Sequence, residues 1–352
     1  MRILFFCTDV YGGHGGIALF NREFVEALLA DPRVEEVVVV PRVVPHPGAH
    51  PVPPRVTYLE RAARSQAVYA ADALRLSRET FDLVICGHVN LLPVARLAAK
   101  HPLLITHGID AWKRLDRLRT KLLHDCTGVI SVSALTRDRL IAWSGYQGRT
   151  FVLPNAVRLE NYGIRPKPQT LIERYHLKGK RVVLTVGRIS GAERYKGFDE
   201  MLEVLVELPQ DVVSVMAGGG NDASRLQKKA RALGVASRVV FTGLFPESEK
   251  ADLYALADVY AMPSRGEGFG FVFLEAMASG IPVIASKHDG GREALLDGKL
   301  GLLVDPANPA EIRAAIIELL ARGKPRIPEG LEFFAFPRFI ERVGAIVDSV
   351  VG

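Results

Sequence analysis

Residues 262–305 of this chain, MPSRGEGFGFVFLEAMASGIPVIASKHDGGREALLDGKLGLLVD, decide its fold. They place Glu267 in a glycine-rich loop and Glu275 eight residues later, inside a short apolar helix. Gly280 and Pro282 end that helix, and the apolar run IPVIAS then predicts a buried strand. Buried strands that alternate with helices indicate a parallel sheet covered on both faces, so the segment predicts an α/β domain.

The GEGFG loop before this helix favours an anionic ligand. Backbone N–H groups at the start of a helix are unpaired, and the helix dipole adds partial positive charge there. A diphosphate group suits such a site, with N–H groups contributed by Gly268, Phe269, Gly270 and Phe271. The two carboxylates that bracket the loop can accept hydrogen bonds from sugar and ribose hydroxyls.

The segment resembles the E-x7-E signature of the retaining family-4 glycosyltransferases, which have the GT-B fold. The resemblance continues along the chain in the family's order, through the glycine-rich start YGGHGG and the motifs THG, VLPNAV, VGR and YKG. It implies two Rossmann-like parallel-sheet α/β domains that face each other across a cleft. It also implies a C-terminal helix that crosses back to the first domain.

The same resemblance implies an activity. A hexose would pass from a UDP- or GDP-sugar to a glycan or to a polyprenyl- or lipid-linked acceptor, in polysaccharide or glycolipid biosynthesis. The implied reaction retains the anomeric configuration, because the acceptor hydroxyl attacks from the face that the diphosphate leaves. The nucleotide sugar is a substrate in this reaction, so we expect no cofactor.

Length and patterning predict two domains. The chain has 352 residues, 48% apolar and 24% charged, which is enough for two domains that each bury a core. A polar, proline-containing stretch at 155–171 separates two series of strand-like runs. These lie at 2–7, 37–40, 82–87, 103–106 and 128–133, and then at 181–188, 212–220, 238–243, 257–264 and 281–286. We expect an acceptor-binding domain at 1–160, a nucleotide-sugar-binding domain at 161–336 and a returning helix at 337–352.

Composition indicates a globular protein of a reducing compartment. The opening apolar run RILFFC is too short for a membrane span or a signal peptide. The three cysteines have no metal-binding spacing, and Cys7 and Cys86 lie in apolar runs where buried reduced thiols are expected. We therefore expect a cytoplasmic protein. The sequence contains no nucleic-acid-binding motif, so nucleic acid is not an expected partner.

The formal net charge of +6 is concentrated in the first half of the chain. Residues 1–162 carry 20 Lys and Arg against 15 Asp and Glu, whereas residues 163–352 carry 25 against 24. The run AWKRLDRLRTKLL predicts a basic helix with an apolar face of Leu115, Leu118 and Leu122. Its cations are Lys113, Arg114, Arg117, Arg119 and Lys121. Such a helix docks on the inner face of an anionic membrane or binds an acceptor pyrophosphate, unless it is a solvated face above a core-packing stripe.

Two cations of the second domain predict a diphosphate site. Arg188 follows a strand-like run and Lys196 opens the next helix, and both are flanked by glycines. Arginine offers a planar fork and lysine a compact charge, although two solvated cations are the alternative. By resemblance, this pair neutralises the leaving diphosphate, Glu267 contacts the transferred sugar and Glu275 contacts the ribose.

Two further acidic side chains of this region have alternative interpretations. The apolar neighbours of Glu275 predict that it is buried and needs a partner, whereas a helix-surface glutamate would make only a local contact. Glu293, in the motif GGRE, is either a further site residue or a favourable charge at the start of a helix.

The first domain begins with the glycine-rich loop YGGHGG, between a strand and a helix. Gly13, Gly15 and Ala18 also match G-x-G-x-x-A, the dinucleotide-binding fingerprint, and Arg42 fits a 2′-phosphate. An NADP-dependent oxidoreductase is therefore one alternative. A GT-B sugar-nucleotide epimerase and a non-catalytic sugar-nucleotide binder are the others. By resemblance, the loop contacts the donor through Gly15 and Gly16 and lies over the acceptor.

His107, at the end of the run LLIT, is the candidate catalytic residue of the first domain. A lone histidine at a strand end is commonly a structural hydrogen-bonding group. The resemblance implies instead that His107 touches the sugar or polarises the acceptor site. Asp110 is a weaker candidate, and His88 either lines the acceptor cleft or satisfies loop backbone. The expected catalytic residues are His107, Arg188, Lys196 and Glu267.

The sequence lacks the usual metal-binding patterns. It contains no D-x-D pair, no HExxH motif and no Cys/His cluster. A transferase that holds its diphosphate with Arg188, Lys196 and backbone N–H groups needs no divalent cation. We therefore expect metal-independent transfer.

Overall fold

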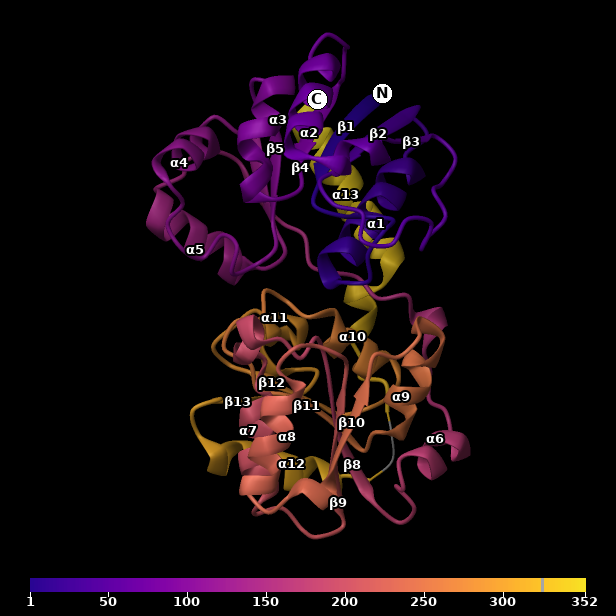
Figure 1. Ribbon diagram of the computed structural model, residues 1–352. Helices are drawn as coiled ribbons and strands as arrows, with labels where there is room; N and C mark the ends of the chain where they lie inside the picture. Colours follow the sequence, from indigo (N-terminus) through magenta and orange to yellow (C-terminus); the bar gives the residue numbers. More distant parts are fainter. Residues whose placement is uncertain (324–325) are drawn as a thin grey trace. The chain divides into compact units, whose positions relative to one another are not determined.

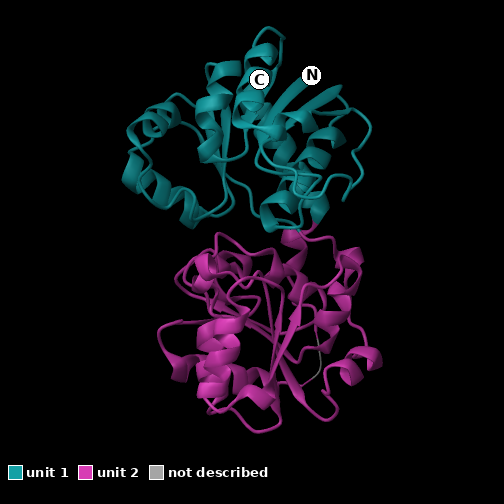
Figure 2. Cartoon of the chain, viewed as in Figure 1, with its two compact units in different colours: residues 1–156, 336–352 teal, residues 157–335 magenta. Residues whose placement is uncertain are grey.

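The computed structural model describes residues 1–323 and 326–352, which divide into two compact units (Figure 2). The first unit combines residues 1–156 with 336–352, and the second holds residues 157–335. The division after residue 156 precedes the boundary expected after residue 160. Val157 donates its backbone N–H to Phe334 O at 2.8 Å and forms a β-bridge with Ala335. The two points at which the chain passes from one unit to the other therefore lie side by side.

A seven-stranded parallel sheet forms the first unit (Figure 1). Its strands, in the spatial order β3-β2-β1-β4-β5-β6-β7, are Val56–Tyr58, Glu36–Pro41, Arg2–Cys7, Leu83–Cys86, Leu103–Thr106, Gly128–Ser131 and Thr150–Val152. Its α-helices are α1 (Gly16–Ala30), α2 (Gln66–Leu76), α3 (Leu92–Ala98), α4 (Arg117–His124), α5 (Ala134–Ser144) and α13 (Phe336–Val351). The strand order reverses between β1 and β4, and ligands of open α/β sheets bind at such switch points.

The two faces of this sheet are covered by different helices, because successive side chains of a strand point to opposite faces. Phe5 of β1 packs on Phe24 of α1, with ring centroids 5.8 Å apart. Its neighbour Phe6 packs on Tyr69 of α2, with centroids 5.9 Å apart. Both rings of β1 are fully buried, so the core of this unit lies on either side of its central strand.

The last helix belongs to the first unit. α13 begins at Phe336, one residue before the expected start, and packs against α1. Phe339 of α13 meets Phe20 of α1 edge to face, with centroids 5.8 Å apart. The predicted return of the C-terminal helix to the first domain is therefore confirmed.

A six-stranded parallel sheet forms the second unit. Its strands, in the order β10-β9-β8-β11-β12-β13, are Val239–Gly243, Val212–Ala217, Arg181–Val186, Val259–Met262, Val283–Ser286 and Leu302–Val304. Its α-helices are α6 (Gln169–Arg174), α7 (Phe198–Leu205), α8 (Ala223–Ala232), α9 (Lys250–Leu256), α10 (Phe271–Ala278), α11 (Gly291–Ala294) and α12 (Pro309–Ala321). The switch point of this sheet lies between β8 and β11.

All three cysteines are buried free thiols. Burial raises the pKa of each, to about 12 for Cys126, so the thiols of Cys7, Cys86 and Cys126 stay protonated. Among the described residues, no helix has both the length and the apolar character that crossing a membrane requires.

Candidate active site

The carboxyl edge of the second sheet carries the candidate donor-binding residues. Arg188 follows β8, and Lys196 ends the short helix η4 (Gly191–Lys196) that comes next. Glu267 lies in the loop between β11 and α10, and Glu275 lies inside α10. Because β8 and β11 are adjacent strands, the fold brings the loops of both motifs to the switch point.

Glu193 joins the two predicted cations and was not identified from the sequence. Its carboxylate forms an ion pair with the guanidinium of Arg188, and its Oε2 lies 3.1 Å from Lys196 Nζ. The side chain of Arg188 is 71% exposed, whereas that of Lys196 is 18% exposed. An incoming diphosphate would therefore replace Glu193 as the partner of both cations. The signal in the sequence was an acidic residue three positions before Lys196.

Glu267 lies within the electrostatic reach of the same group. Burial raises the pKa of its carboxyl, the positive charge of Lys196 lowers it, and the negative charge of Glu193 raises it. Backbone groups of Gly268 and Phe269 also lower it. The structure thus brings Glu267, Lys196 and Arg188 together, and their catalytic roles remain predictions.

The loop from Gly268 to Phe271 contributes its one fully buried aromatic side chain, that of Phe269, to the core. Phe269 is 1% exposed and packs on Phe334 with ring centroids 5.5 Å apart, so its ring belongs to the core. Gly270 adopts φ +94°, a conformation that favours glycine, immediately before α10 begins at Phe271. A predicted donor contact by Gly268, Phe269 or Gly270 must therefore come from backbone groups.

Asp289 fixes this loop and was also missed. Its fully buried carboxylate accepts hydrogen bonds from Glu267 N at 2.9 Å, from Gly291 N at 3.0 Å and from the Ser264 hydroxyl. Gly290 donates its N–H to Glu267 O at 2.8 Å, and a Cβ at this glycine would lie 2.0 Å from Gly268 O. The motif HDGG therefore places one buried acid and one obligatory glycine behind the Glu267 loop.

Asp289 gives the second unit a predictable dependence of stability on pH. Burial raises the pKa of its carboxyl from the ordinary 3.8 to about 7, so the folded protein retains a proton that the unfolded chain releases. Stability is then lost as pH rises through this window, by up to about 1.4 kcal/mol per pH unit. We expect wild type to lose melting temperature relative to Asp289→Asn between pH 5 and 7, and the difference to level off above pH 8. Parallel melting curves across this range would contradict the shift.

Glu275 is buried and holds two partners. It is 3% exposed, its Oε2 accepts a hydrogen bond from Tyr254 OH at 2.7 Å, and its Oε1 lies 2.5 Å from Lys250 Nζ. Burial alone would lower the pKa of Lys250, but the charges of Glu275 and Glu247 outweigh it and the pKa is raised. A carboxylate has about four lone-pair sites, so two partners leave capacity for ribose hydroxyls.

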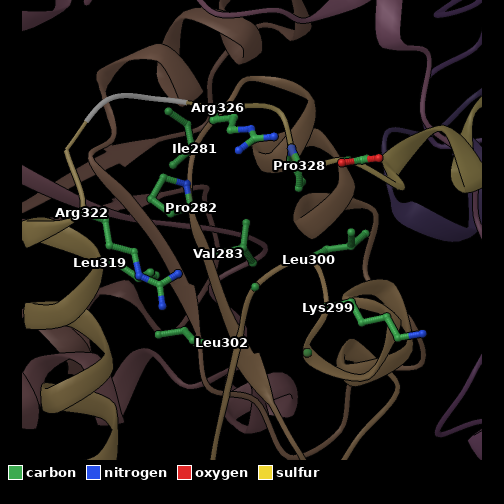
Figure 3. Close-up of a pocket in the computed structure, with 13 residues that line it drawn as sticks. Ile281, Pro282, Val283, Lys299, Leu300, Leu302, Leu319, Arg322, Arg326 and Pro328 are labelled. Atoms are coloured by element: carbon green, nitrogen blue, oxygen red, sulfur yellow. The ribbon is translucent and has the colours of Figure 1, made fainter.

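Two other features of this unit lie apart from the predicted donor residues. Glu293 is partly buried in the first turn of α11, as expected of a favourable charge at a helix start. A cavity of about 570 Å³ opens at the amino ends of β12 and β13, with Arg322 and Arg326 directed toward it (Figure 3). None of the residues that line it is a predicted site residue, because those follow the carboxyl ends of the strands.

His107 occupies the end of β5 and is a neutral imidazole. Its Nε2 lies 2.9 Å from the carbonyl oxygen of Gly87, which assigns the ring proton to that nitrogen. Burial lowers its pKa to about 4, and Phe20 meets the ring edge to face with centroids 5.1 Å apart. His107 is therefore held by structural contacts, as the alternative interpretation anticipated, and a catalytic role remains a prediction.

The two weaker candidates of this region surround His107. Asp110 accepts from His107 N at 3.1 Å, and burial raises the pKa of its carboxyl to about 7. His88 Nε2 lies 3.9 Å from Asp110 Oδ2, and burial lowers the pKa of the His88 imidazole to about 4. Its Nδ1 accepts from Asn90 N at 3.1 Å, so His88 satisfies loop backbone, as one interpretation proposed.

The glycine-rich loop of the first unit divides into a packed and an exposed part. Gly12 and Gly13 are buried, and a Cβ at Gly13 would lie 1.7 Å from the Asp9 carboxylate. Gly15 and Gly16 are exposed at the N-terminus of α1. The two predicted donor-binding glycines, Gly15 and Gly16, are thus accessible to a ligand. At Gly12 and Gly13, close packing leaves no room for a side chain.

The prediction of a basic helix is partly wrong. α4 begins only at Arg117, because Asp116 caps it by accepting from Arg119 N at 2.8 Å, so Lys113 and Arg114 precede the helix. Leu118 is 57% exposed and does not belong to a core-packing stripe. The cations that remain exposed are Lys113, Arg114, Arg117 and Lys121.

Comparison with known proteins identifies the family. The model of glycosyltransferase family 4 matches residues 14–161, and that of glycosyl transferases group 1 matches residues 169–327. The chain belongs to the family-4 glycosyltransferases. Together the two matches include Gly15, Gly16, His107 and the four predicted donor-binding side chains of the second unit, Arg188, Lys196, Glu267 and Glu275.

Curated relatives are somewhat more than a third identical to this chain over the segments that align. The GDP-mannose-dependent α-(1-6)-phosphatidylinositol monomannoside mannosyltransferase of Mycolicibacterium smegmatis is 36% identical over 245 residues, which are 65% of this chain and 63% of that protein. The D-inositol 3-phosphate glycosyltransferase of Corynebacterium jeikeium is 37% identical over 160 residues, 43% of this chain and 38% of that protein. The match thus spans less than two thirds of either relative.

Solved structures confirm the GT-B fold class. Anabaena HepE (Alr3699), crystallised with UDP and glucose, has a TM-score of 0.78 at 21% identity and covers 99% of this chain and 100% of its own. Sucrose-phosphate synthase of Thermosynechococcus elongatus has a TM-score of 0.72 at 22% identity, with coverage of 99% and 96%. The comparisons do not favour the oxidoreductase, epimerase or binder alternatives.

Proposed function

We propose that this protein is a retaining, metal-independent hexosyltransferase that uses a nucleotide-diphosphate sugar. The observation that carries the proposal is the cluster at the carboxyl edge of β8 and β11, where Arg188, Lys196 and the Glu267 loop converge. Two cations that share one carboxylate suit a diphosphate, which offers a bidentate anion in place of Glu193. Glu275, buried beside the same loop, suits the ribose hydroxyls.

The proposed reaction uses each group at a defined step. As the glycosidic bond breaks, negative charge grows on the leaving diphosphate, where Arg188, Lys196 and the loop N–H groups stabilise it. The acceptor hydroxyl attacks the anomeric carbon from the same face and passes its proton to a phosphate oxygen. Glu267 positions the sugar hydroxyls, and the neutral His107 accepts a hydrogen bond at Nδ1, because its Nε2–H is donated to the Gly87 carbonyl oxygen.

The relatives suggest the substrates. GDP-mannose is our first choice of donor, because the mycobacterial relative is named as dependent on it, and UDP-glucose is second because HepE was crystallised with it. Both named relatives act on inositol that bears a phosphate, so we propose a phosphoinositol acceptor, free or lipid-linked. The exposed cations near α4, with Leu118, would hold the protein on the inner face of an anionic membrane, in the cytoplasm.

A thermal-shift panel tests the donor and the metal requirement together. A ligand that binds only the folded protein at 100 times its Kd stabilises it by about 2.7 kcal/mol. We expect GDP and GDP-mannose to raise the melting temperature, with or without EDTA, because protein groups rather than a cation hold the diphosphate. A response to UDP alone would change the donor, and a response abolished by EDTA would contradict metal independence. Stabilisation by NADP alone would overturn the proposed function.

A further inference from the structure

Three histidine side chains meet in the first unit, outside the groups discussed above. The ring of His14 lies 5.7 Å from that of His46 and 5.3 Å from that of His50, measured between centroids. His14 and His46 are exposed and His50 is partly buried. We call these three residues the histidine cluster.

The fold joins the two loops that carry the cluster. His14 lies in the glycine-rich loop after β1, and the other two lie in the long loop after β2. His46 N donates to Gly12 O at 2.9 Å, and His50 N donates to Tyr11 O at 3.1 Å. These backbone bonds hold the second loop against the first, so the segments that carry the three histidines lie side by side.

The cluster lies where this sheet would bind a ligand. β2, β1, β4 and β5 are consecutive in the sheet, and the segments that follow their carboxyl ends carry five of the nine histidines of the chain. Besides the cluster, these are His88 and His107. Ligands of open α/β sheets bind at the carboxyl edge near the switch point, which here is β1/β4. Gly15 and Gly16, exposed beside His14, belong to the same edge.

The chemistry of the cluster favours an anion. Imidazoles donate N–H groups, and a nearby anion stabilises their protonated form. Among residues 1–323 and 326–352, no group of three or more ligating side chains is placed to hold a metal ion. The Asp9 carboxylate is engaged with the loop backbone, accepting from Gly12 N at 3.2 Å.

A hollow of about 290 Å³ lies at the same carboxyl edge of the sheet, beside two arginines. It is lined by Val44 of the long loop and by residues of the helix η1 (Glu60–Arg64), which contribute Arg61, Arg64 and the acidic Glu60. Arg61 also pairs with Asp72 at 2.5 Å. A Cβ at Gly12 would lie 2.6 Å from Val44, so the hollow adjoins the glycine-rich loop.

We propose that the histidine cluster binds the phosphate group of the acceptor. The proposal rests on the proposed function and adds the part of the protein that selects the acceptor. A phosphate offers several anionic acceptor oxygens, so one group can accept hydrogen bonds from more than one imidazole of the cluster. The phosphate belongs either to a free monoester or to a lipid diester, and both present the same oxygens.

Phosphate titration followed by NMR tests binding without relying on activity. With ¹⁵N-labelled histidine, the ring signals of His14, His46 and His50 should shift with inorganic phosphate in the presence of saturating GDP. His101, which precedes β5 at the opposite edge of this sheet, should not shift. His46→Gln should weaken the response at least about tenfold, the loss of one hydrogen bond to a charged group, and His101→Gln should not. An equal response to chloride, or an unchanged response in His46→Gln, would overturn the proposal.

Kinetics then identify the source of the phosphate. With D-inositol 3-phosphate or phosphatidylinositol vesicles as acceptor, His46→Gln should raise KM at least about tenfold while KM for the donor stays unchanged. Preference for the first acceptor assigns a monoester, and preference for the second assigns a lipid diester. Free inositol used as well as either would overturn the proposal. If no nucleotide binds, the proposed function fails, and the phosphate titration repeated without GDP still decides whether the histidine cluster binds phosphate.

Discussion

Replacing Lys196 with methionine is expected to lower kcat by about 10²–10³, the loss typical of removing one group that stabilises transition-state charge. Lys196 is the less exposed of the two cations that share Glu193, so its charge is poorly screened by water. Methionine is unbranched and keeps most of the length of the side chain, but it lacks the charged ammonium group. KM for the donor should change less than kcat, because the charge on the diphosphate grows as the bond breaks.

Arg194 supplies the matched control for this experiment. It lies in the same short helix as Lys196, but its guanidinium pairs with Asp222 at 3.3 Å instead of Glu193. Arg194→Gln should therefore leave kcat within about twofold, as a surface change does. Equal losses in the two variants would assign the effect to general charge and would contradict the role of Lys196.

Glu193→Gln tests the same site through a change that should strengthen ligand binding rather than weaken it. Glu193 and the donor diphosphate compete for Arg188 and Lys196, so the glutamine variant should bind a nucleoside diphosphate more tightly. Weaker binding would show that Glu193 positions the cations rather than competing for them. Isothermal titration with GDP separates the two outcomes.

The sequence predicted the central strands of both sheets because those strands are continuous apolar runs. The edge strands β3, β7 and β13 were missed, because each has only three residues and at most one of them is fully buried. Short apolar runs of this kind cannot be told from loops by periodicity. The late start of α4 was missed because the capping aspartate, Asp116, lies inside a run that has helical composition throughout.

The residues of the candidate site likewise fall into those that the sequence predicted and those that it did not. Arg188, Lys196, Glu267 and Glu275 were found from local motifs, whereas three of their partners were not. Glu193, Lys250 and Asp289 are charged residues in segments with no distinctive pattern, and only the packing of loops identifies their partners. Lys250, at the start of α9, meets Glu275 from 25 positions away in the sequence. Local sequence therefore identifies candidate ligand-binding groups but not the groups that hold them in place.

Lys250→Met is expected to destabilise the second unit by about 3–5 kcal/mol, because it leaves the buried carboxylate of Glu275 without its cation. The side chains of this pair are 15% and 4% exposed, so water cannot replace the lost charge. For a domain of this size we expect the melting temperature to fall by roughly 10 °C. Differential scanning calorimetry measures it.

The double variant Lys250→Met/Glu275→Leu separates the structural from the functional part of this pair. Replacing both members of a buried ion pair with apolar side chains is often neutral or stabilising, so the double variant should regain most of the lost melting temperature. It should still bind GDP poorly, because the ribose hydroxyls have lost their acceptor. Recovery of both stability and nucleotide binding would show that Glu275 serves the fold alone, and that the second glutamate of the E-x7-E motif has no ligand in this protein.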